Sequence, residues 1–460
     1  MQRAGRAVAR AVLQDFEEIG GFPAEGRVLV LVGKGHNGGD ALIAAREILE
    51  RFPGARAEVI FVFGERVLRP LAARAWRELS GSATVLGRIV MLRPGAAALP
   101  CDLCLDGVFG FQFRPTAEER VMKLFETVNA LPVRLRAAVD LPSAGLFRAD
   151  FTYATGILKV PVVAEFWANA GRVRYVDLGF FRGDEAGAMR VLTPAVLAPL
   201  AALRASDSDK RTYGHVFVVG GSRSYPGAVL MTVLAALRSG AGLVTAFVPE
   251  SLVPAFAARA PEAMWVGWPE TPDGGLALEG QHLLTTRIGR ATALVIGPGL
   301  GREKETLALV LDIVTTAMVP LVIDADALQE DVVRAGSAPR VLTPHAGEYA
   351  RIAEAVGENA VLVRKGPVTR VSGGAGAETY HSFFGGPVLA RGGSGDVLAG
   401  LIGAQLAQTP GDALLAAARG VVWHGLAADA LARAHGQVAV QTTQVLDFLG
   451  VALRESAHEQ

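Results

Sequence analysis

One stretch indicates the fold and chemistry of this chain more clearly than any other: Ala390-Arg-Gly-Gly-Ser-Gly-Asp396, followed directly by Val397-Leu-Ala-Gly-Leu-Ile402. Three glycines at the start of a helix present successive backbone N–H groups that can bind a phosphoryl group during its transfer. Asp396 falls in the first helical turn, where a carboxylate can accept a proton from a substrate hydroxyl. The alternative is a structural helix start in which Asp396 only complements the helix dipole. We interpret the loop as a phosphoryl-transfer site.

Glycine-rich or polar segments also follow other predicted strands in the second half of the chain. These segments are Gly220–Ser222 after His215–Val219, Gly297–Gly301 after Ala293–Ile296, Asp324–Asp326 after Leu321–Ile323, Thr343–Glu348 after Val341–Leu342, and Lys365–Thr369 after Ala360–Arg364. Ligands of open α/β sheets bind beyond the carboxyl ends of the strands, so we expect the segments to meet at one edge. Lys365 is a candidate ligand of nucleotide phosphates, with an ordinary surface lysine as the alternative.

Strand-like apolar runs alternate with helical stretches along the whole chain, which predicts an α/β protein with mostly parallel sheets. The further predicted strands are Arg27–Val32, Ala57–Phe63, Leu103–Val108, Arg136–Asp140 and Leu243–Val248. A length of 460 residues suggests more than one domain. The pattern loosens between Asp184 and Asp209, so we predict domains of residues 1–203 and 204–460. The glycine-rich segment 372–376 is expected to be a hairpin tip.

Composition excludes several classes of protein. Lys plus Arg and Asp plus Glu number 45 each, so the chain lacks the basic field that non-specific binding to nucleic acid or anionic membranes requires. It contains no uncharged apolar run of membrane-spanning length and begins with no signal-peptide core, so we expect a cytoplasmic protein without nucleic-acid or membrane partners. Cys101 and Cys104 form an isolated Cys-x-x-Cys pair, which we interpret as core residues rather than a redox or zinc site.

A second candidate site lies in the first half, in the turn Gly33-Lys-Gly-His-Asn-Gly-Gly-Asp40 between a strand and a helix. Such a turn allows its backbone to approach a phosphate or ribose closely. Asp106 and Asp140 end two other strands, so we expect Asn37, Asp40, Asp106 and Asp140 to converge. Oxygen donors such as these, with Ser143, suit a hard cation, and caps and turns are the structural alternative. His36 either takes part in proton transfer or hydrogen-bonds the loop.

The first half resembles the epimerase domain of the bifunctional NAD(P)H-hydrate repair enzymes. The resemblance rests on Met1–Gly5, Gly33–Asp40, Asp106–Gly110 and Asp140–Ser143. It implies a Rossmann-like three-layer domain that interconverts the R and S forms of NAD(P)H hydrate with the help of a potassium ion. Asn37, Asp106 and Ser143 would bind potassium, and Asp140 would be the catalytic acid or base. The implied substrate-binding residues are His36, Asn37, Gly38, Gly39, Asp40, Gly110 and Asp140.

This sequence departs from the epimerase pattern at three places. It has His36-Asn37 where two asparagines are usual, Ala41 in place of glycine, and Phe111-Gln112 in place of Thr-Gly. Two bulky side chains in place of a small pair are expected to close the loop that faces the phosphate. A structural N-terminal domain without epimerase activity is therefore the alternative.

The second half, residues 206–450, is similar to the ADP-dependent (S)-NAD(P)H-hydrate dehydratases, a branch of the ribokinase-like superfamily. The similarity rests on the glycine-rich and polar segments named above, together with Pro226–Ala228. It implies that ADP, or ATP, phosphorylates the ring hydroxyl and that loss of phosphate restores the dihydronicotinamide, with Asp396 as the base and magnesium as a cofactor. Ala228, Gly301, His345 and Asp396 would contact the hydrate, and the implied nucleotide-binding residues are Lys365, Gly366, Pro367, Val368, Thr369 and Gly395.

Arg391 departs from the usual residue and would either assist or obstruct a phosphate. Two other functions stay open from the sequence: a ribokinase-like kinase of a small molecule such as a hydroxymethylpyrimidine or thiazole, and a non-catalytic nucleotide-binding or scaffold protein. We expect a homo-oligomer, although no residue pattern specifies the number of subunits.

Overall fold

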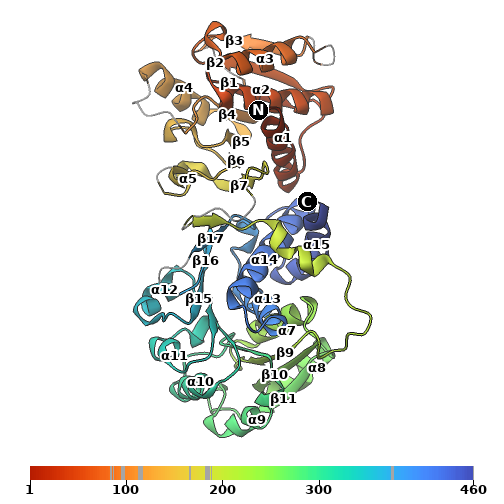
Figure 1. Cartoon of the computed structure of the whole chain (residues 1–460), viewed down its shortest axis with the longest axis vertical. Coiled ribbons are helices and arrows are strands. Elements are labelled where there is room, and N and C mark those ends of the chain that lie inside the picture. Colours follow the sequence, from red (N-terminus) through yellow and green to blue (C-terminus); the bar gives the residue numbers. More distant parts are fainter. Residues whose placement is uncertain are drawn as a thin grey trace. The chain divides into compact units, whose positions relative to one another are not determined.

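The chain divides into two compact units, one built from Met1–Glu185 with Ala432–Gly436 and the other from Ala186–Leu431 with Gln437–Gln460. The structure is a computed structural model that describes residues 1–82, 85, 87–94, 99–111, 118–164, 167–181, 187, 189–374 and 378–458. Each unit consists of a sheet with helices packed on its faces (Figure 1). The predicted α/β class with mostly parallel sheets is therefore confirmed.

The sheet of the first unit contains seven described strands, all parallel, in the order β3-β2-β1-β4-β5-β6-β7. The strands are β1 (Arg27–Val32), β2 (Arg56–Phe61), β3 (Ile89–Leu92), β4 (Cys101–Gly107), β5 (Val133–Val139), β6 (Phe151–Thr155) and β7 (Arg172–Val176). The chain leaves β1 toward β2 and β3 and then resumes on the other side with β4. The topological switch point, where ligands bind in such sheets, therefore lies between β1 and β4.

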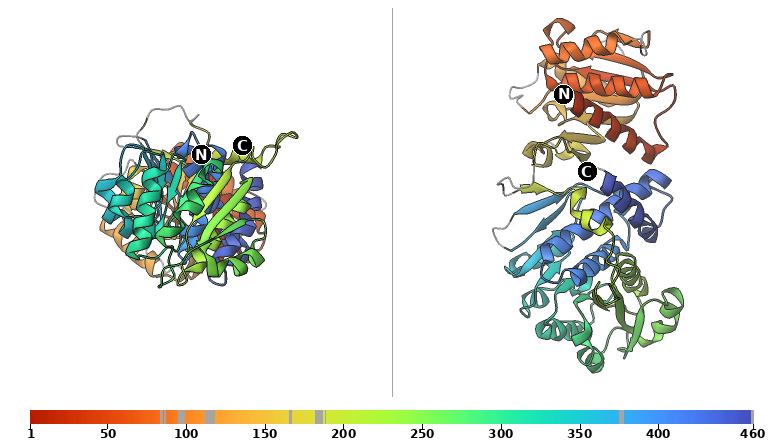
Figure 2. Two further views of the ribbon diagram at one scale, coloured as in Figure 1. Left: turned by 90° about the horizontal axis from the view of Figure 1, so that it is seen from below. Right: turned by 45° about the vertical axis from the view of Figure 1, so that its right-hand side comes forward.

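Helices cover both faces of this sheet (Figure 2). They are α1 (Gln2–Phe16), α2 (His36–Arg51), α3 (Pro70–Ser80), α4 (Glu119–Ala130), α5 (Val160–Ala164) and α6 (Trp167–Ala170), with the short 3-10 helices η1 (Glu17–Ile19), η2 (Glu65–Val67) and η3 (Ser143–Gly145). Strand β1 shows why both faces are apolar. Val28, Val30 and Val32 pack in the core beneath α1 to α3, whereas Leu29 and Leu31 pack in the core beneath α4.

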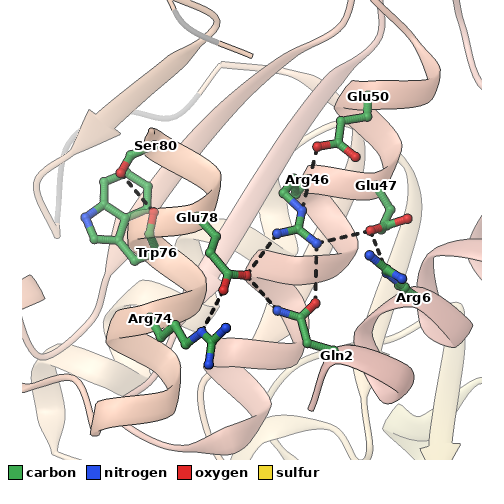
Figure 3. A network of polar contacts seen from close by, with 9 residues as sticks. All are labelled: Gln2, Arg6, Arg46, Glu47, Glu50, Arg74, Trp76, Glu78 and Ser80. Carbon is green, nitrogen blue, oxygen red and sulfur yellow. Dashed lines mark hydrogen bonds and ion pairs between the residues drawn. The ribbon is translucent and has the colours of Figure 1, made fainter. Parts of the chain in front are cut away.

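A polar network links α1, α2 and α3 on the outer side of the first unit (Figure 3). Arg46 is central to it and donates hydrogen bonds to Glu78 at 3.0 Å and to Gln2 at 3.3 Å. Arg6 pairs with Glu47 at 3.0 Å on the same side. Because the side chain of Arg46 is only 12% exposed, its ion pairs are better shielded from solvent than ordinary surface pairs. The network therefore helps to fix α2, whose first turn carries candidate site residues.

The sheet of the second unit contains ten described strands in the order β11-β10-β9-β12-β13-β14-β15-β16-β17-β8. The strands are β8 (Met189–Val191), β9 (His215–Val219), β10 (Leu243–Pro249), β11 (Met264–Trp268), β12 (Ala293–Ile296), β13 (Leu321–Ile323), β14 (Arg340–Leu342), β15 (Ala360–Arg364), β16 (Thr369–Ser372) and β17 (Thr379–Ser382). In this order, all strands from β11 through β10, β9, β12, β13 and β14 to β15 are parallel. Strand β16 is antiparallel to both of its neighbours. The switch point here lies between β9 and β12.

Helices pack on both faces of the second sheet as well. They are α7 (Pro226–Arg238), α8 (Val253–Arg259), α9 (Gln281–Thr285), α10 (Lys304–Thr316), α11 (Glu330–Arg334), α12 (Ala346–Ile352), α13 (Ser394–Gln408), α14 (Ala413–His435) and α15 (Leu449–His458). The 3-10 helices are η4 (Pro194–Ala201), η5 (Glu250–Leu252), η6 (Leu278–Gly280), η7 (Ile288–Arg290), η8 (Ala325–Ala327), η9 (Ala353–Ala355), η10 (Pro387–Leu389) and η11 (Thr442–Phe448). Helix α13 packs so closely on α7 that a Cβ at Gly400 would lie 2.2 Å from the carbonyl oxygen of Thr232. This contact fixes the helix that follows the glycine-rich loop.

The division between the units falls at Glu185, before the boundary predicted at residue 203. The stretch over which the sequence pattern loosens, 184–209, contains β8, which pairs with β17 at the edge of the second sheet. Its loose composition gives no local signal for a strand, because the pairing partner lies far away in the sequence. Residues 201–207 are exposed, as expected for this stretch.

The predicted strands, the hairpin and the burial of the two cysteines are confirmed. Every strand named above from the sequence is present within a few residues, and β16 and β17 form the hairpin expected around residues 372–376. Cys101 and Cys104 are free and buried in β4, and burial raises the pKa of Cys101 to about 11. In the part of the chain that is described, no helix combines the length and apolarity needed to cross a membrane.

Candidate functional sites

The first candidate site lies at the switch point between β1 and β4, where the loops after these strands touch. A Cβ at Gly33 would lie 1.8 Å from the carbonyl oxygen of Val108, and one at Gly107 would lie 2.5 Å from that of Asn37. Gly38 and Gly39 are equally confined, by the carbonyl oxygen of Gly33 and by the side chain of Met1. Side chains at these positions would therefore separate the loops, which explains the glycines physically.

The three residues predicted as potassium ligands surround the backbone of Phe109. Asn37 donates hydrogen bonds through Nδ2 to the carbonyl oxygens of Phe109 and Val139, each at 3.0 Å. The N–H of Phe109 donates to the hydroxyl of Ser143 at 2.9 Å. Asp106 in turn accepts hydrogen bonds from Ser143, at 2.8 Å from its N–H and 2.6 Å from its hydroxyl. The structure thus brings Asn37, Asp106 and Ser143 into one network.

This network fits a hard monovalent cation by its donor chemistry. It offers a carboxylate, a hydroxyl, backbone carbonyls and an amide oxygen, and the last faces Gly110, where a Cβ would lie 3.2 Å from Oδ1 of Asn37. Burial raises the pKa of Asp106 to about 6, although hydrogen bonds from Ser143 and Val108 oppose the shift. A bound cation would offset the cost of burying this charge. Within the described ranges, no group of three or more His, Cys, Asp or Glu residues is arranged to hold a metal ion.

Asp40 and Asp140 are the two carboxylates beside this network. Asp140 follows β5 with a positive φ of 76°, and its N–H donates to the carbonyl oxygen of Tyr153 at 2.9 Å. Its carboxylate accepts a hydrogen bond from Thr155 and forms an ion pair with Lys159. Asp40 is buried, and its Oδ1 has no hydrogen-bond partner among the described residues. Burial, together with the charge of Asp140, raises the pKa of Asp40 to about 7.

The raised pKa of Asp40 predicts a pH-dependent cost to stability. The folded state keeps a proton that the unfolded state releases, so stability falls as the pH rises from about 4 to about 7. We expect Asp40→Asn to stabilise the protein by about 2–4 kcal/mol at pH 8 and by little at pH 4. Thermal unfolding of the full chain at the two pH values checks this, with the exposed Asp207→Asn as control. An equal change in Tm at both pH values would refute it.

Two departures noted in the sequence lie at the edge of this site. His36 is exposed at the first residue of α2, and Phe111 is 55% exposed. The ring of Phe111 therefore does not fill the core of the unit. Gln112 lies outside the described residues.

Sequence reasoning missed Thr155 and Lys159. Both follow the rule that polar residues at the ends of strands mark a site. Strand β6 is not among the strands that the sequence predicts, so neither its last residue, Thr155, nor Lys159 beyond it could be placed at a strand end. The alternation of Phe151, Tyr153 and Thr155 with smaller residues was the signal available.

The second candidate site lies at the switch point between β9 and β12, where three loops interlock through their backbones. The N–H of Gly221 donates to the carbonyl oxygen of Pro298 at 2.8 Å. Gly297 has a φ of 129°, and a Cβ there would lie 1.8 Å from the carbonyl oxygen of Asp324. The loops after β9, β12 and β13 therefore form one surface, as the positions of their glycines predict.

Lys365 and Asp324 form the buried centre of this site. The ammonium group of Lys365 lies 2.9 Å from Oδ1 of Asp324 and 3.9 Å from Glu348, and Thr343 donates to the same oxygen of Asp324 at 2.7 Å. Burial by itself would lower the pKa of Lys365, but Asp324 and Glu348 outweigh it and raise the pKa. Lys365 therefore carries a positive charge at neutral pH.

The glycine-rich loop places that charge beside the start of α13. Gly393 has a φ of 89° and caps the helix, and a Cβ at Gly395 would lie 3.1 Å from Nζ of Lys365. Asp396 lies in the first turn, and its pKa is raised to about 6, first by burial and then by the charge of Asp324. Backbone N–H groups, an ammonium group and a carboxylate thus lie together, which are the parts needed to transfer a phosphoryl group to a hydroxyl.

The structure also places the other predicted hydrate-binding residues. The hydroxyl of Thr232 donates to the carbonyl oxygens of Ala228 at 3.1 Å and Asp396 at 3.0 Å, which joins α7 to α13. The N–H of Gly301 donates to Asp326 at 3.2 Å, and Gly301 also lies near the hydroxyl of Ser222, where a Cβ would be 3.9 Å away. Ala228 and Asp396 therefore lie in the first turns of the adjacent helices α7 and α13, and the loop that contains Gly301 reaches α7, since a Cβ at Gly299 would lie 3.0 Å from that of Ala228.

His345 has a structural role as well as a place in the site. Its Nδ1 accepts hydrogen bonds from the N–H groups of Gly347 at 3.0 Å and Glu348 at 3.3 Å, and its own N–H donates to Glu348 at 2.8 Å. This is a capping box for α12. Because Nδ1 accepts hydrogen bonds, Nε2 is the nitrogen that carries the proton, and it lies 3.4 Å from Oε1 of Glu348.

The predicted nucleotide-binding segment runs from Lys365 at the centre of the site to Thr369 at the start of β16. The N–H of Lys365 donates to the carbonyl oxygen of Pro344 at 2.9 Å, which links this segment to the loop after β14. Gly366 and Pro367 are exposed, whereas Val368 and Thr369 are half-buried. The segment thus forms an open rim beside the start of α13.

Arg391 points toward the loop around Val438. Its guanidinium donates to the carbonyl oxygens of Gln437 at 2.7 Å and Val438 at 2.8 Å. The same loop lines a cavity of about 510 Å³ formed by Val438, Ala439, Val440, Gln441 and Gln444. Thr442 links it to the glycine-rich loop through a hydrogen bond to the carbonyl oxygen of Gly392 at 2.8 Å. Arg391 therefore helps to shape the rim of this cavity.

Two family models match the chain. Residues 216–450 match the model described as NAD(P)H-hydrate dehydratase, and residues 1–159 match the model described as YjeF-related protein N-terminus. Two bifunctional NAD(P)H-hydrate repair enzymes are similar along nearly the whole chain. That of Moorella thermoacetica is 34% identical and is matched over 100% of this chain and 93% of its own length. That of Gloeobacter violaceus is 36% identical, over 95% of this chain and 89% of its own length.

Solved structures resemble the second unit. A ribokinase-like superfamily protein from Enterococcus faecalis is 28% identical with a TM-score of 0.52, and the match covers 60% of this chain and 99% of that one. The ADP/ATP-dependent NAD(P)H-hydrate dehydratase from Bacillus subtilis, co-crystallised with ATP and Mg²⁺, is 26% identical with a TM-score of 0.50. That match covers 59% of this chain and 100% of the other.

Proposed function

This chain belongs to the family of bifunctional NAD(P)H-hydrate repair enzymes, and from that premise we propose how its two sites divide the reaction. The enzyme epimerises the R and S forms of NAD(P)H hydrate and dehydrates the S form to NAD(P)H with an adenine nucleotide. The first unit carries the epimerase site, and the ribokinase-like second unit carries the dehydratase site.

The dehydratase proposal rests on one arrangement, that of Lys365 beside Gly395 and Asp396 at the start of α13. Asp396 accepts the proton of the ring hydroxyl while that oxygen attacks the terminal phosphorus of ADP, and AMP leaves. Inorganic phosphate then departs with the C–O electrons, and loss of a ring proton completes the double bond of the dihydronicotinamide. Lys365 and the backbone N–H groups stabilise the charge of the phosphoryl group in transfer.

In the epimerase site, Asp140 acts as acid and base. The hydroxyl on the hydrated ring carbon leaves with its bonding electrons and a donated proton, as water, while the ring nitrogen supplies electrons to that carbon. Water then adds to the opposite face and gives up a proton. Asp140 and the buried Asp40 are the two groups positioned for these transfers.

Both cations of this proposal fit the residues present. Potassium would be held by Asn37, Asp106 and Ser143, where its charge would neutralise the buried Asp106. Magnesium commonly binds through substrate phosphates and few carboxylates. In the second site Asp324 and Asp326 already pair with Lys365 and Arg302, so the nucleotide phosphates would supply most of its ligands. Cytoplasmic location and homo-oligomerisation stay predictions.

The experiment that tests the proposal measures dihydronicotinamide absorbance after purified protein is added to mixed R and S NADH hydrate, with ADP or ATP, potassium and magnesium. We expect recovery from both epimers, faster than their spontaneous exchange. Recovery of the S fraction alone would show an inactive first unit. A stable phosphorylated product without NADH would indicate a small-molecule kinase, and binding without turnover would indicate a scaffold.

Lys365 provides a test of nucleotide binding. We expect Lys365→Met to weaken the Kd for ADP at least tenfold, because a charged hydrogen bond to phosphate contributes about 1.5–3 kcal/mol. Calorimetric titration measures this, with the exposed Lys123→Met as control. Since the substitution removes the ion-pair partner of the buried Asp324, the double variant Asp324→Asn/Lys365→Met separates lost binding from lost stability. Unchanged affinity in both variants would contradict the assignment.

A further inference from the structure

A short segment at the end of β6 surrounds the proposed acid and base Asp140. The hydroxyl of Thr155, the last residue of β6, donates to Oδ1 of Asp140 at 3.2 Å. Lys159 lies four residues further on, and its ammonium group contacts the same carboxylate oxygen. The ammonium group also donates to the carbonyl oxygen of Thr155 at 3.2 Å. The side chains of Thr155 and Lys159, with the carbonyl oxygen of Thr155, thus fix the orientation of the Asp140 carboxylate.

This ion pair is shielded from water. The side chain of Lys159 is 13% exposed and that of Asp140 is 8% exposed. An ion pair that is shielded from water keeps its geometry more firmly than a surface pair, because neither group can exchange its partner for solvent. Both of these contacts go to Oδ1, so Oδ2 is the oxygen of Asp140 that they leave available for proton transfer.

The backbone of Asp140 is held by the same strand. Its φ of 76° is in the left-handed region, which costs a residue other than glycine about 1–3 kcal/mol. The N–H of Asp140 donates to the carbonyl oxygen of Tyr153 in β6 at 2.9 Å. Strand β6 therefore sets both the backbone and the carboxylate of Asp140, and such backbone strain is typical of a functional site.

We infer that Lys159 is a positioning residue of the epimerase site, which acts through Asp140 by fixing its carboxylate with Oδ2 toward the hydrated ring. Thr155 supports the same orientation. The inference rests on the proposed function of the first unit. Asp40, on α2, is a second carboxylate near Asp140, and the charges of both Asp140 and Lys159 act on its pKa.

The test is steady-state epimerisation of R NADH hydrate by the full chain, coupled to its own dehydratase unit with ADP in excess. We expect Lys159→Met to lower kcat about 10–100-fold with little change in KM, because a misplaced catalytic group lowers the rate after the substrate is bound. Lys159→Arg should recover part of the rate, since it restores the charge. Thr155→Val should lower kcat only a few-fold.

Controls separate this inference from the proposed function. Lys123→Met, in the exposed part of α4, should behave as the unmodified protein, and dehydration of S hydrate should proceed normally in every variant. If the unmodified protein fails to epimerise, the proposed function of the first unit is wrong. If it epimerises and Lys159→Met does so equally fast, or only KM rises, the inference is wrong. If Lys159→Met does not fold, the rates of Lys159→Arg and Thr155→Val test the inference instead.

Discussion

Asp396→Asn is expected to lower the dehydratase kcat about 10²–10⁴-fold, which is the range that a general base contributes. Asparagine keeps the size of the side chain but cannot accept the proton of the ring hydroxyl. It also keeps α13 intact, since a polar residue in the first turn remains. ADP should therefore still bind. The measurement is recovery of dihydronicotinamide absorbance together with phosphate release from S NADH hydrate.

The pH dependence of the unmodified enzyme follows from the same residue. The pKa of Asp396 is raised to about 6, so its basic form is lost as the pH falls below that value. We expect kcat/KM for dehydration to decline below about pH 6.

A matched control for the Asp396→Asn variant is Asp331→Asn, because Asp331 lies in the first turn of α11 but is exposed. An Asp396→Asn variant that binds ADP and turns over within tenfold of the unmodified rate would exclude Asp396 as the base.

Asp140→Asn is expected to reduce epimerisation about 10²–10⁴-fold while dehydration of S hydrate continues. Asparagine tolerates the positive φ of this position, so the backbone should keep its conformation. Mixed R and S hydrate should then show a fast phase for the S fraction, followed by a slow phase limited by spontaneous exchange. The amplitudes of the two phases measure the effect directly.

A matched control for this variant is Asp177→Asn, because Asp177 follows β7 as Asp140 follows β5 but is exposed. Thermal unfolding of Asp140→Asn shows whether the loss of the pair with Lys159 destabilises the unit. Equal recovery of both epimers in a single fast phase would show that Asp140 is not the acid and base.

Much of the fold and of both candidate sites was predictable from local sequence. Strands such as Arg27–Val32 and His215–Val219 are continuous apolar runs because both faces of a parallel sheet are buried. The polar residues that follow such strands meet at one edge, because parallel strands all end there. This is why Asn37, Asp40, Asp106 and Asp140 could be grouped although they lie far apart in the sequence, whereas the choice of Asn37, Asp106 and Ser143 as cation ligands is what the family resemblance implies.

What the sequence could not decide depends on partners that are distant in the chain. Strand β8 becomes a strand only by pairing with β17, and Lys159 becomes part of a site only because β6 lies beside β5. The sequence likewise could not show where Arg391 points, because its carbonyl acceptor at Val438 lies in a loop that is distant in the chain. The sequence by itself determined the alternation of strands and helices and the chemistry of the loops, because burial and turn formation are local. Tertiary structure alone decided which side chains share a carboxylate, because that depends on strand order.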